Sequence, residues 1–128
     1  MLTAELQKTI TKAAEDALKR RHEYLTLEHL LYALTEEQTG AEVLFNCGCD
    51  LKLLRQELEQ FLSDAMEVVP ATMEYTLSQT AAYERVLRRA IMQAHASGQT
   101  TIDSGNVIAA MFEERRSHAV YLDRKSVV

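Results

Sequence analysis

The sequence predicts an all-α protein built from two copies of one helical unit. Apolar residues recur at spacings of three and four along most of the chain, which is the period of a helix with one buried face. The 128 residues include one proline and four glycines, too few for an all-β fold with many turns. Residues of the first half also correspond to residues 77 positions later, as Thr3 does to Thr80.

The first two helices are predicted from their apolar faces and their N-terminal caps. The first helix runs from Thr3 to about Arg21 and presents charged residues opposite its alanine- and leucine-rich face. The second helix begins after Thr26, whose hydroxyl can accept a bond from an otherwise unpaired backbone N–H, and it extends to about Glu36. Glu28 falls in its first turn, where the positive end of the helix dipole favours a carboxylate.

Two further helices are predicted before the middle of the chain. Thr39-Gly40-Ala41-Glu42 has the pattern of a capping box that opens a short helix, and Gly48 would end it. Asp50 would cap a longer helix, and its buried face should carry five residues: Leu51, Leu54, Leu58, Phe61 and Leu62. Helical periodicity then fails over residues 67–79, which contain Pro70 and are predicted to be a connecting loop.

The second unit repeats this arrangement. A helix from Thr80 to about Ala96 would stop at Gly98, and Asp103 would cap the next helix. The inward faces of these two helices include Ile91 and Phe112, and a seventh helix is expected to begin at Ser117. The boundaries predicted for one domain, 1–128, are a first repeat at 1–66, a linker at 67–79 and a second repeat at 80–128.

The repeat preserves residue type and capping chemistry rather than identity. The corresponding pairs are Ala13 and Ala90, Ala17 and Ala94, Thr26 and Asp103, and Glu36-Glu37 and Glu113-Glu114. Two copies of one unit should preserve these features because each copy buries the same stripe. Val128 corresponds to Leu51, so the last helix of the second repeat is expected to be missing or truncated.

Composition excludes several classes of function. The formal net charge of −5 argues against general nucleic-acid binding, which needs a basic surface. No signal peptide is visible, and no apolar run approaches the roughly 20 residues of a membrane span. Cys47-Gly48-Cys49 matches neither a redox C-x-x-C nor a four-ligand zinc motif, so two reduced thiols are expected.

No catalytic site is predicted. There is no G-x-S-x-G, no cysteine in a catalytic context and no phosphate-binding loop. His22 and His29, with Glu23 nearby, could bind a metal, but no further ligands follow at fixed spacing. We therefore expect no metal site and interpret these histidines as polar turn residues, with His22, Glu23 and Glu28 at one polar corner. Arg85, Arg88 and Arg89 indicate a solvated helix face or a docking patch for an acidic partner.

The chain resembles the N-terminal domain of the ClpA-type AAA+ unfoldases of the bacterial Clp protease. The matching residues in the first unit are Met1-Leu2, Glu5-Leu6, the run from Arg21 to Leu31, Asp50-Leu51 and the run from Leu54 to Glu59. Those in the second unit are Arg85-Val86-Leu87, Arg89-Ala90, Ser97-Gly98, Gly105-Asn106-Val107 and the run from Tyr121 to Lys125. The resemblance implies two tandem four-helix repeats with pseudo-twofold symmetry.

The resemblance also implies partners. Such a domain receives substrate polypeptides and docks the adaptor ClpS above a hexameric ATPase ring that feeds the ClpP peptidase in the bacterial cytoplasm. ATP and magnesium would belong to ring domains absent from this chain, so this segment would be neither an enzyme nor a cofactor-binding unit. It is expected to be monomeric and to bind neither nucleic acid nor membrane. By analogy, the ClpS-facing residues map onto Glu23, Glu28, Thr80 and Arg85.

Two rival interpretations remain open at this point. A ClpC- or ClpB-type N-terminal domain would share the double repeat but bind other adaptors or aggregated polypeptides. A stand-alone helical regulatory protein would belong to a different class altogether.

Overall fold

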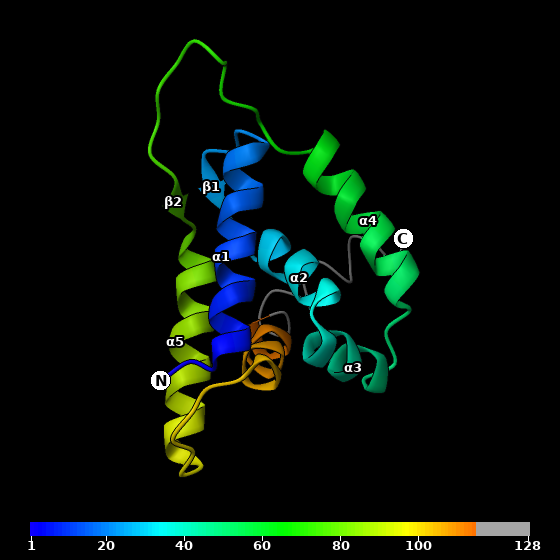
Figure 1. Cartoon of the computed structure of the whole chain (residues 1–128), viewed down its shortest axis with the longest axis vertical. Coiled ribbons are helices and arrows are strands. Elements are labelled where there is room, and N and C mark those ends of the chain that lie inside the picture. Colours follow the sequence, from blue (N-terminus) through cyan, green and yellow to red (C-terminus); the bar gives the residue numbers. More distant parts are fainter. Residues whose placement is uncertain (115–128) are drawn as a thin grey trace.

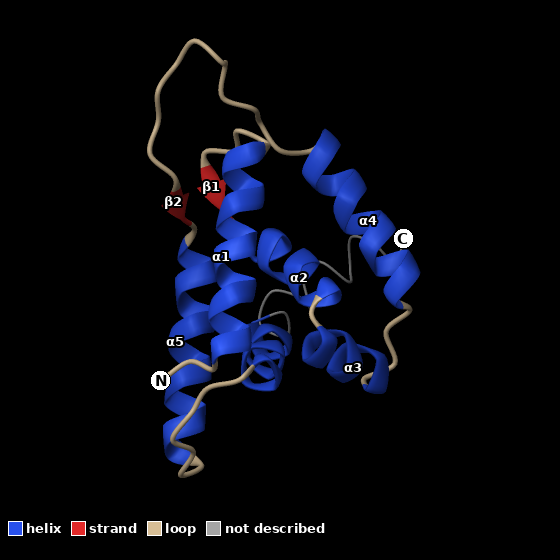
Figure 2. Ribbon diagram, viewed as in Figure 1, coloured by secondary structure: helices blue, strands red, loops and turns tan. Residues whose placement is uncertain are grey.

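The computed structural model describes residues 1–114 as helices joined mostly by short connections (Figure 1). The helices are α1 (Ala4–Lys19), α2 (Leu27–Glu36), α3 (Gln38–Asn46), α4 (Leu51–Asp64), α5 (Ala81–Ala96) and a helix over 104–114. Two short strands, β1 (Tyr24–Leu25) and β2 (Ser78–Gln79), complete the described part (Figure 2). The all-α prediction is confirmed, and the helix expected from Ser117 lies outside the described residues.

One apolar core joins the two halves of the chain. α1 and α5 each contribute a buried stripe of small residues, Ala13 and Ala17 from the first and Ala90 and Ala94 from the second. Larger side chains fill the space around these small residues, as the close packing of a protein interior requires. The larger fully buried residues of this core include Leu6, Leu30, Leu34, Tyr83, Ile102 and Ile108.

Backbone pairing gives direct evidence of the pseudo-twofold relation. β1 and β2 pair in parallel with Leu25 opposite Gln79, and the N-terminal segment pairs in parallel with Leu2 opposite Ile102. The shift of 77 residues converts one pair into the other, since Leu25 corresponds to Ile102 and Leu2 to Gln79. The amide of Thr80 donates to the Leu25 carbonyl at 3.1 Å and that of Thr3 donates to the Ile102 carbonyl at 3.0 Å.

Helix capping follows the same symmetry. The hydroxyl of Thr3 caps α1 and that of Thr80 caps α5, each accepting a backbone N–H at 3.2 Å. Asp103 and Asn106 form a reciprocal capping box with two bonds of 2.9 Å. The predicted caps at Thr26, Asp50 and Asp103 are confirmed, because side-chain oxygens satisfy the free N–H groups of the first turn.

The predicted capping box at Thr39 is wrong. α3 begins earlier, with Glu37 as its N-cap, and the Glu37 carboxylate accepts the Gly40 N–H at 3.1 Å. The hydroxyl of Thr9 on α1 donates to the same carboxylate. Gly40 packs against the backbone of Leu34, whose carbonyl oxygen would lie 2.4 Å from an added Cβ. Because α2 and α3 pack closely, the buried carboxylate of Glu37 caps α3 instead of Thr39.

The loop predicted over 67–79 is only partly irregular. It ends in β2, and Val68 forms an antiparallel bridge with His22. A two-residue strand has no periodicity to detect in a sequence, and it exists here only because β1 lies beside it. The connection between the two repeats is thus attached to the first repeat by backbone bonds.

Three residues predicted to face inward are substantially exposed. Phe61 is 40% exposed, Ile91 41% and Phe112 37%. Each lies at the edge of an apolar stripe, where helical spacing alone cannot tell a buried position from a boundary position. The exposed ring of Phe61 lines a groove on the surface of the domain.

Candidate functional site

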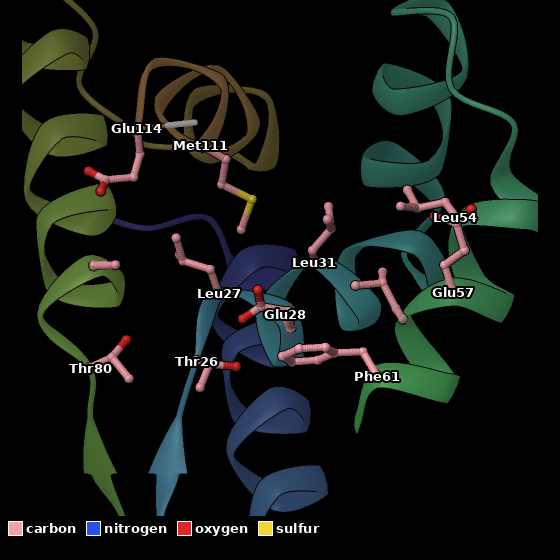
Figure 3. Close-up of a pocket in the computed structure, with 12 residues that line it drawn as sticks. Thr26, Leu27, Glu28, Leu31, Leu54, Glu57, Phe61, Thr80, Met111 and Glu114 are labelled. Carbon is pink, nitrogen blue, oxygen red and sulfur yellow. The ribbon is translucent and has the colours of Figure 1, made fainter. Parts of the chain in front are cut away.

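A groove of about 620 Å³ lies between α2, α4, the start of α5 and the helix over 104–114. Both repeats therefore contribute to its walls. Its apolar lining consists mainly of Leu27, Leu31, Leu54, Leu58, Phe61 and Met111. Figure 3 shows Phe61 extending from α4 towards Glu28, and Met111 extending into the groove from the opposite helix.

Carboxylates surround this apolar lining. Glu28, Glu57 and Glu114 line the groove, and none of the described lining residues is a lysine or arginine. Within the described part, Glu28 and Glu57 take part in no ion pair. The arrangement offers apolar contact area with negative charge beside it, which favours a partner that carries apolar and basic groups together.

Glu114 is held by Arg85. The Arg85 guanidinium donates two bonds to the Glu114 carboxylate, at 2.8 and 3.3 Å, a bidentate geometry that suits a planar donor. The Glu114 side chain is 5% exposed, whereas that of Arg85 is 46% exposed. Hydrogen bonding to Glu114 raises the pKa of Arg85. This pair links α5 to the helix over 104–114 at the edge of the groove.

The structure brings together part of the predicted ClpS-facing set. Glu28 and Thr80 line the same groove although they belong to different repeats. Thr80 is half-buried, and its hydroxyl accepts the Tyr83 amide. Arg85 reaches the groove through Glu114, while Glu23 is exposed just before β1 and does not line the groove. The role of the four residues in docking stays a prediction.

Sequence reasoning missed Glu57, Met111 and Glu114 as lining residues. The internal repeat carried a signal for Glu114, because it corresponds to Glu37, the buried carboxylate that caps α3. Both residues are buried, at 4% and 8% exposure. No such signal from the repeat indicated Glu57, which lines the groove because α4 packs on α2.

The interpretation of His22 and His29 as polar turn residues is wrong. Both are buried, and His22 Nδ1 lies 2.8 Å from His29 Nε2. The Thr26 amide donates to His29 Nδ1 at 3.0 Å, which completes the capping box of α2. His29 thus takes the place of the glutamate usual in a capping box, as Asn106 does in the second repeat. Only Glu23 and Glu28 remain at the predicted polar corner.

The hydrogen bonds of the pair require two neutral rings. Because His29 Nδ1 accepts, its proton is on Nε2, which donates to His22 Nδ1, so the proton of the His22 ring is on its own Nε2. His22 also bonds to the backbone of Leu62. Burial lowers the pKa of His22, with Arg20 adding to the effect. Burial, and to a lesser degree the repulsion that a protonated His22 would exert, lowers the pKa of His29 to about 4. The pair joins the end of α1 to α2 and α4.

Neither a metal cluster nor a membrane span is found in the described part of the chain. No group of three or more histidine, cysteine, aspartate or glutamate side chains within 1–114 could hold a metal ion. None of the helices described there has the length and apolarity needed to cross a membrane.

The fold and the groove define a duplicated helical-repeat domain with one surface shared by its two repeats. Residues 1–125 match the Clp repeat (R) N-terminal domain, and the chain belongs to that family. This confirms the family resemblance that the sequence motifs indicated.

Individual relatives agree with this assignment. The chain is 38% identical over 120 residues to the ClpA homolog protein of Fuscovulum blasticum, matching 93% of this chain and 15% of the relative. It is 33% identical over 115 residues to chaperone protein ClpB of Pseudomonas putida, matching 88% of this chain and 13% of the relative. The chain thus spans a small fraction of the length of these curated relatives.

Solved structures share the fold at low identity. The Hsp104 N-terminal domain from Candida albicans superposes with a TM-score of 0.79 at 14% identity, covering 95% of this chain and 80% of that one. The N-terminal domain of the ClpV1 ATPase from E. coli gives a TM-score of 0.72 at 22% identity, covering 88% of this chain and 68% of that one.

Proposed function

We propose that this chain is the adaptor- and substrate-docking domain of a ClpA-type AAA+ unfoldase. It binds the adaptor ClpS and substrate polypeptides, and the full-length hexamer delivers those substrates to the ClpP peptidase in the bacterial cytoplasm. Its chemistry is that of protein recognition, while ATP and magnesium act in ring domains outside this chain. The 38% identity to a ClpA homolog across nearly the whole chain supports the choice of branch.

The observation that carries the proposal is the meeting of Glu28 and Thr80 at one apolar groove. These residues come from different repeats, so the surface exists only when the domain is folded. The exposed Glu23 lies in the segment just before β1, and Arg85 borders the groove through its bond to Glu114. Apolar lining with the carboxylates of Glu28 and Glu57 beside it supplies contact area and charge selectivity, which a protein-docking surface requires.

Arg85 has a dual role under this proposal. Its guanidinium holds the buried Glu114 carboxylate and remains exposed enough to share a bond with a carboxylate on ClpS. We expect Arg85→Ala to raise the dissociation constant for ClpS roughly tenfold or more, because it removes a paired donor from the interface. Calorimetric titration with ClpS at low and moderate salt measures this, and binding should weaken as salt is added.

Arg88→Ala is the matched control, since Arg88 is an exposed arginine one turn further along α5. It should leave ClpS affinity unchanged. Glu28→Gln should weaken binding and reduce its salt dependence, because the shape is kept and the charge removed. Equal affinities for wild-type and Arg85→Ala protein would reject the assigned contact, and no ClpS binding by the folded wild-type domain would reject the adaptor assignment.

The apolar lining of the groove favours a second candidate function. Seven apolar side chains at one open surface suit direct capture of unfolded polypeptides, as expected for a ClpB- or ClpC-type domain. The 33% identity to a ClpB chaperone is compatible with this alternative. Titration with an unfolded model substrate in the absence of ClpS would distinguish it, because adaptor-dependent docking requires ClpS for tight substrate binding.

A further inference from the structure

Arg21 occupies an unusual place where α1 ends. Its φ angle is 58°, in the left-handed region, and it is the one non-glycine residue of the described part with a positive φ. The Arg21 amide donates to the Leu18 carbonyl at 3.0 Å, and the His22 amide donates to the Ala17 carbonyl at 2.9 Å. This backbone reversal ends the helix in a motif that normally employs glycine. The chain accepts a strained residue here, which points to a role for its side chain.

The Arg21 side chain is bound to the segment that connects the two repeats. Its guanidinium donates to three backbone carbonyls, those of Val69 at 2.9 Å, Pro70 at 2.8 Å and Met73 at 2.6 Å. The guanidinium also lies over the Tyr75 ring, 5.2 Å from its centroid. The Arg21 carbonyl accepts the Val69 amide at 2.8 Å. One residue thus provides most of the contacts that hold residues 69–75.

These contacts continue directly into the strand pairing. The Ser78 amide donates to the Glu23 carbonyl and the Thr80 amide to the Leu25 carbonyl, each at 3.1 Å. Figure 1 shows the connecting segment as an arch from the end of α4 past the end of α1 to β2. A connection of this length has many conformations available, and fixing its middle restricts where its end can pair.

We propose that Arg21 is the positioning residue of the docking surface. By holding residues 69–75 it sets the register of β2 on β1, and this register bonds the Thr80 amide to the Leu25 carbonyl and places Thr80 at the groove that Glu28 also lines. The inference rests on the proposed function for its effect on binding, but the effect on register is independent of any partner.

Arg20 provides a matched control because it is the neighbouring arginine with a comparable number of bonds. Its guanidinium donates to Asp16 on α1 and to Glu59 on α4, and it makes no bond to the connecting segment. Arg20→Ala should lower global stability without a selective effect on the β1–β2 pairing.

The test is amide hydrogen exchange by NMR on wild-type protein and on the Arg21→Ala, Arg21→Asn and Arg20→Ala variants. Asparagine tolerates the left-handed backbone, so Arg21→Asn removes the guanidinium while keeping the helix end. Both Arg21 variants should accelerate exchange at Val69, Ser78 and Thr80 roughly tenfold relative to amides inside α1 and α4. Arg20→Ala should leave the ratio between those two sets of amides unchanged.

Calorimetric titration with ClpS adds the second readout. Both Arg21 variants should bind about fivefold more weakly than wild type, because the surface is no longer preorganised. Arg21→Lys should bind as weakly, since one ammonium group cannot reach three carbonyls as a guanidinium fork does. Unchanged exchange at Ser78 and Thr80, or uniform acceleration at all amides, would overturn the positioning role.

The two readouts separate two kinds of failure. Selective acceleration with unchanged ClpS affinity would overturn the link to docking. A folded wild-type domain that does not bind ClpS would reject the proposed function, while the exchange data would still decide whether Arg21 sets the register.

Discussion

At the scale of single residues, the buried His22–His29 pair makes the N-terminal cap of α2 sensitive to pH. The Thr26 amide, the His29 ring and the His22 ring form one chain of hydrogen bonds that only neutral imidazoles can satisfy. A proton added to either ring would place two N–H groups against each other or charge a group without access to water. The pair is therefore stable at neutral pH and unfavourable in acid.

The pair predicts a specific dependence of stability on pH. Burial lowers the pKa of His29 from 6.5 to about 4, so the folded state binds fewer protons than the unfolded state between these values. The contribution of this residue is complete above pH 6.5 and is lost as the pH falls towards 4. We expect the free energy of unfolding to be about 2 kcal/mol lower at pH 5 than at pH 7, measured by urea denaturation.

Two variants control this prediction. His29→Asn introduces the residue found at the equivalent cap of the second repeat and should flatten the dependence between pH 5 and pH 7. His95→Gln alters an exposed histidine and should keep the wild-type dependence. An equal dependence in His29→Asn and wild-type protein would show that the buried pair is not its source.

At the scale of elements, the junction of α2 and α3 shows why caps predicted from sequence can be misplaced. Thr39 fits the capping pattern, but Glu37 holds the position because Gly40 lets α3 approach the Leu34 carbonyl. The Glu37 carboxylate then satisfies both the Gly40 N–H and the Thr9 hydroxyl in a buried site. Local pattern suggested one cap, and packing between helices selected another.

Substitution of the two candidate caps tests this junction. Glu37→Ala should lower the free energy of unfolding by about 2–3 kcal/mol, because it leaves two buried donors without an acceptor. Thr39→Ala should change it by about 0.5 kcal/mol or less, since its bond to Glu5 lies at the surface. Chemical denaturation measures both values. A larger loss of unfolding free energy for Thr39→Ala than for Glu37→Ala would support Thr39 as the N-cap of α3.

At the scale of the whole molecule, the two repeats share a symmetry from which the groove departs. Thr3 and Thr80 cap equivalent helices with bonds of equal length and donate to equivalent carbonyls, those of Ile102 and Leu25. Only Thr80 also lines the groove. Structural and docking roles can therefore be separated by comparing the pair.

Thr3→Ala and Thr80→Ala should each lower the free energy of unfolding by about 1 kcal/mol, the usual value of an N-cap. Under the proposed function, only Thr80→Ala should weaken binding to ClpS. Denaturation and calorimetric titration of the two variants measure these effects. Equal loss of ClpS affinity in both variants would mean that general destabilisation, rather than contact at the groove, accounts for the change.

The helices, most of their caps and the duplication could all be predicted from the amino-acid sequence. These features are local or periodic: each helix needs only a buried stripe and a side chain that accepts its free N–H groups, as Thr26 and Asp103 do. The shift of 77 residues was visible because both copies bury the same face, as Ala13 and Ala90 show.

Which side chains contact one another depends on how the helices pack together. The β1–β2 pairing, the buried histidine pair and the Arg21 contacts join residues far apart in the chain or hide residues whose type suggests exposure. The groove also depends on tertiary packing, because Glu57 and Met111 line the same surface only when the two repeats pack together. Periodicity determines which face of a helix is buried, and the packing of helices against each other determines which side chains remain together at the surface.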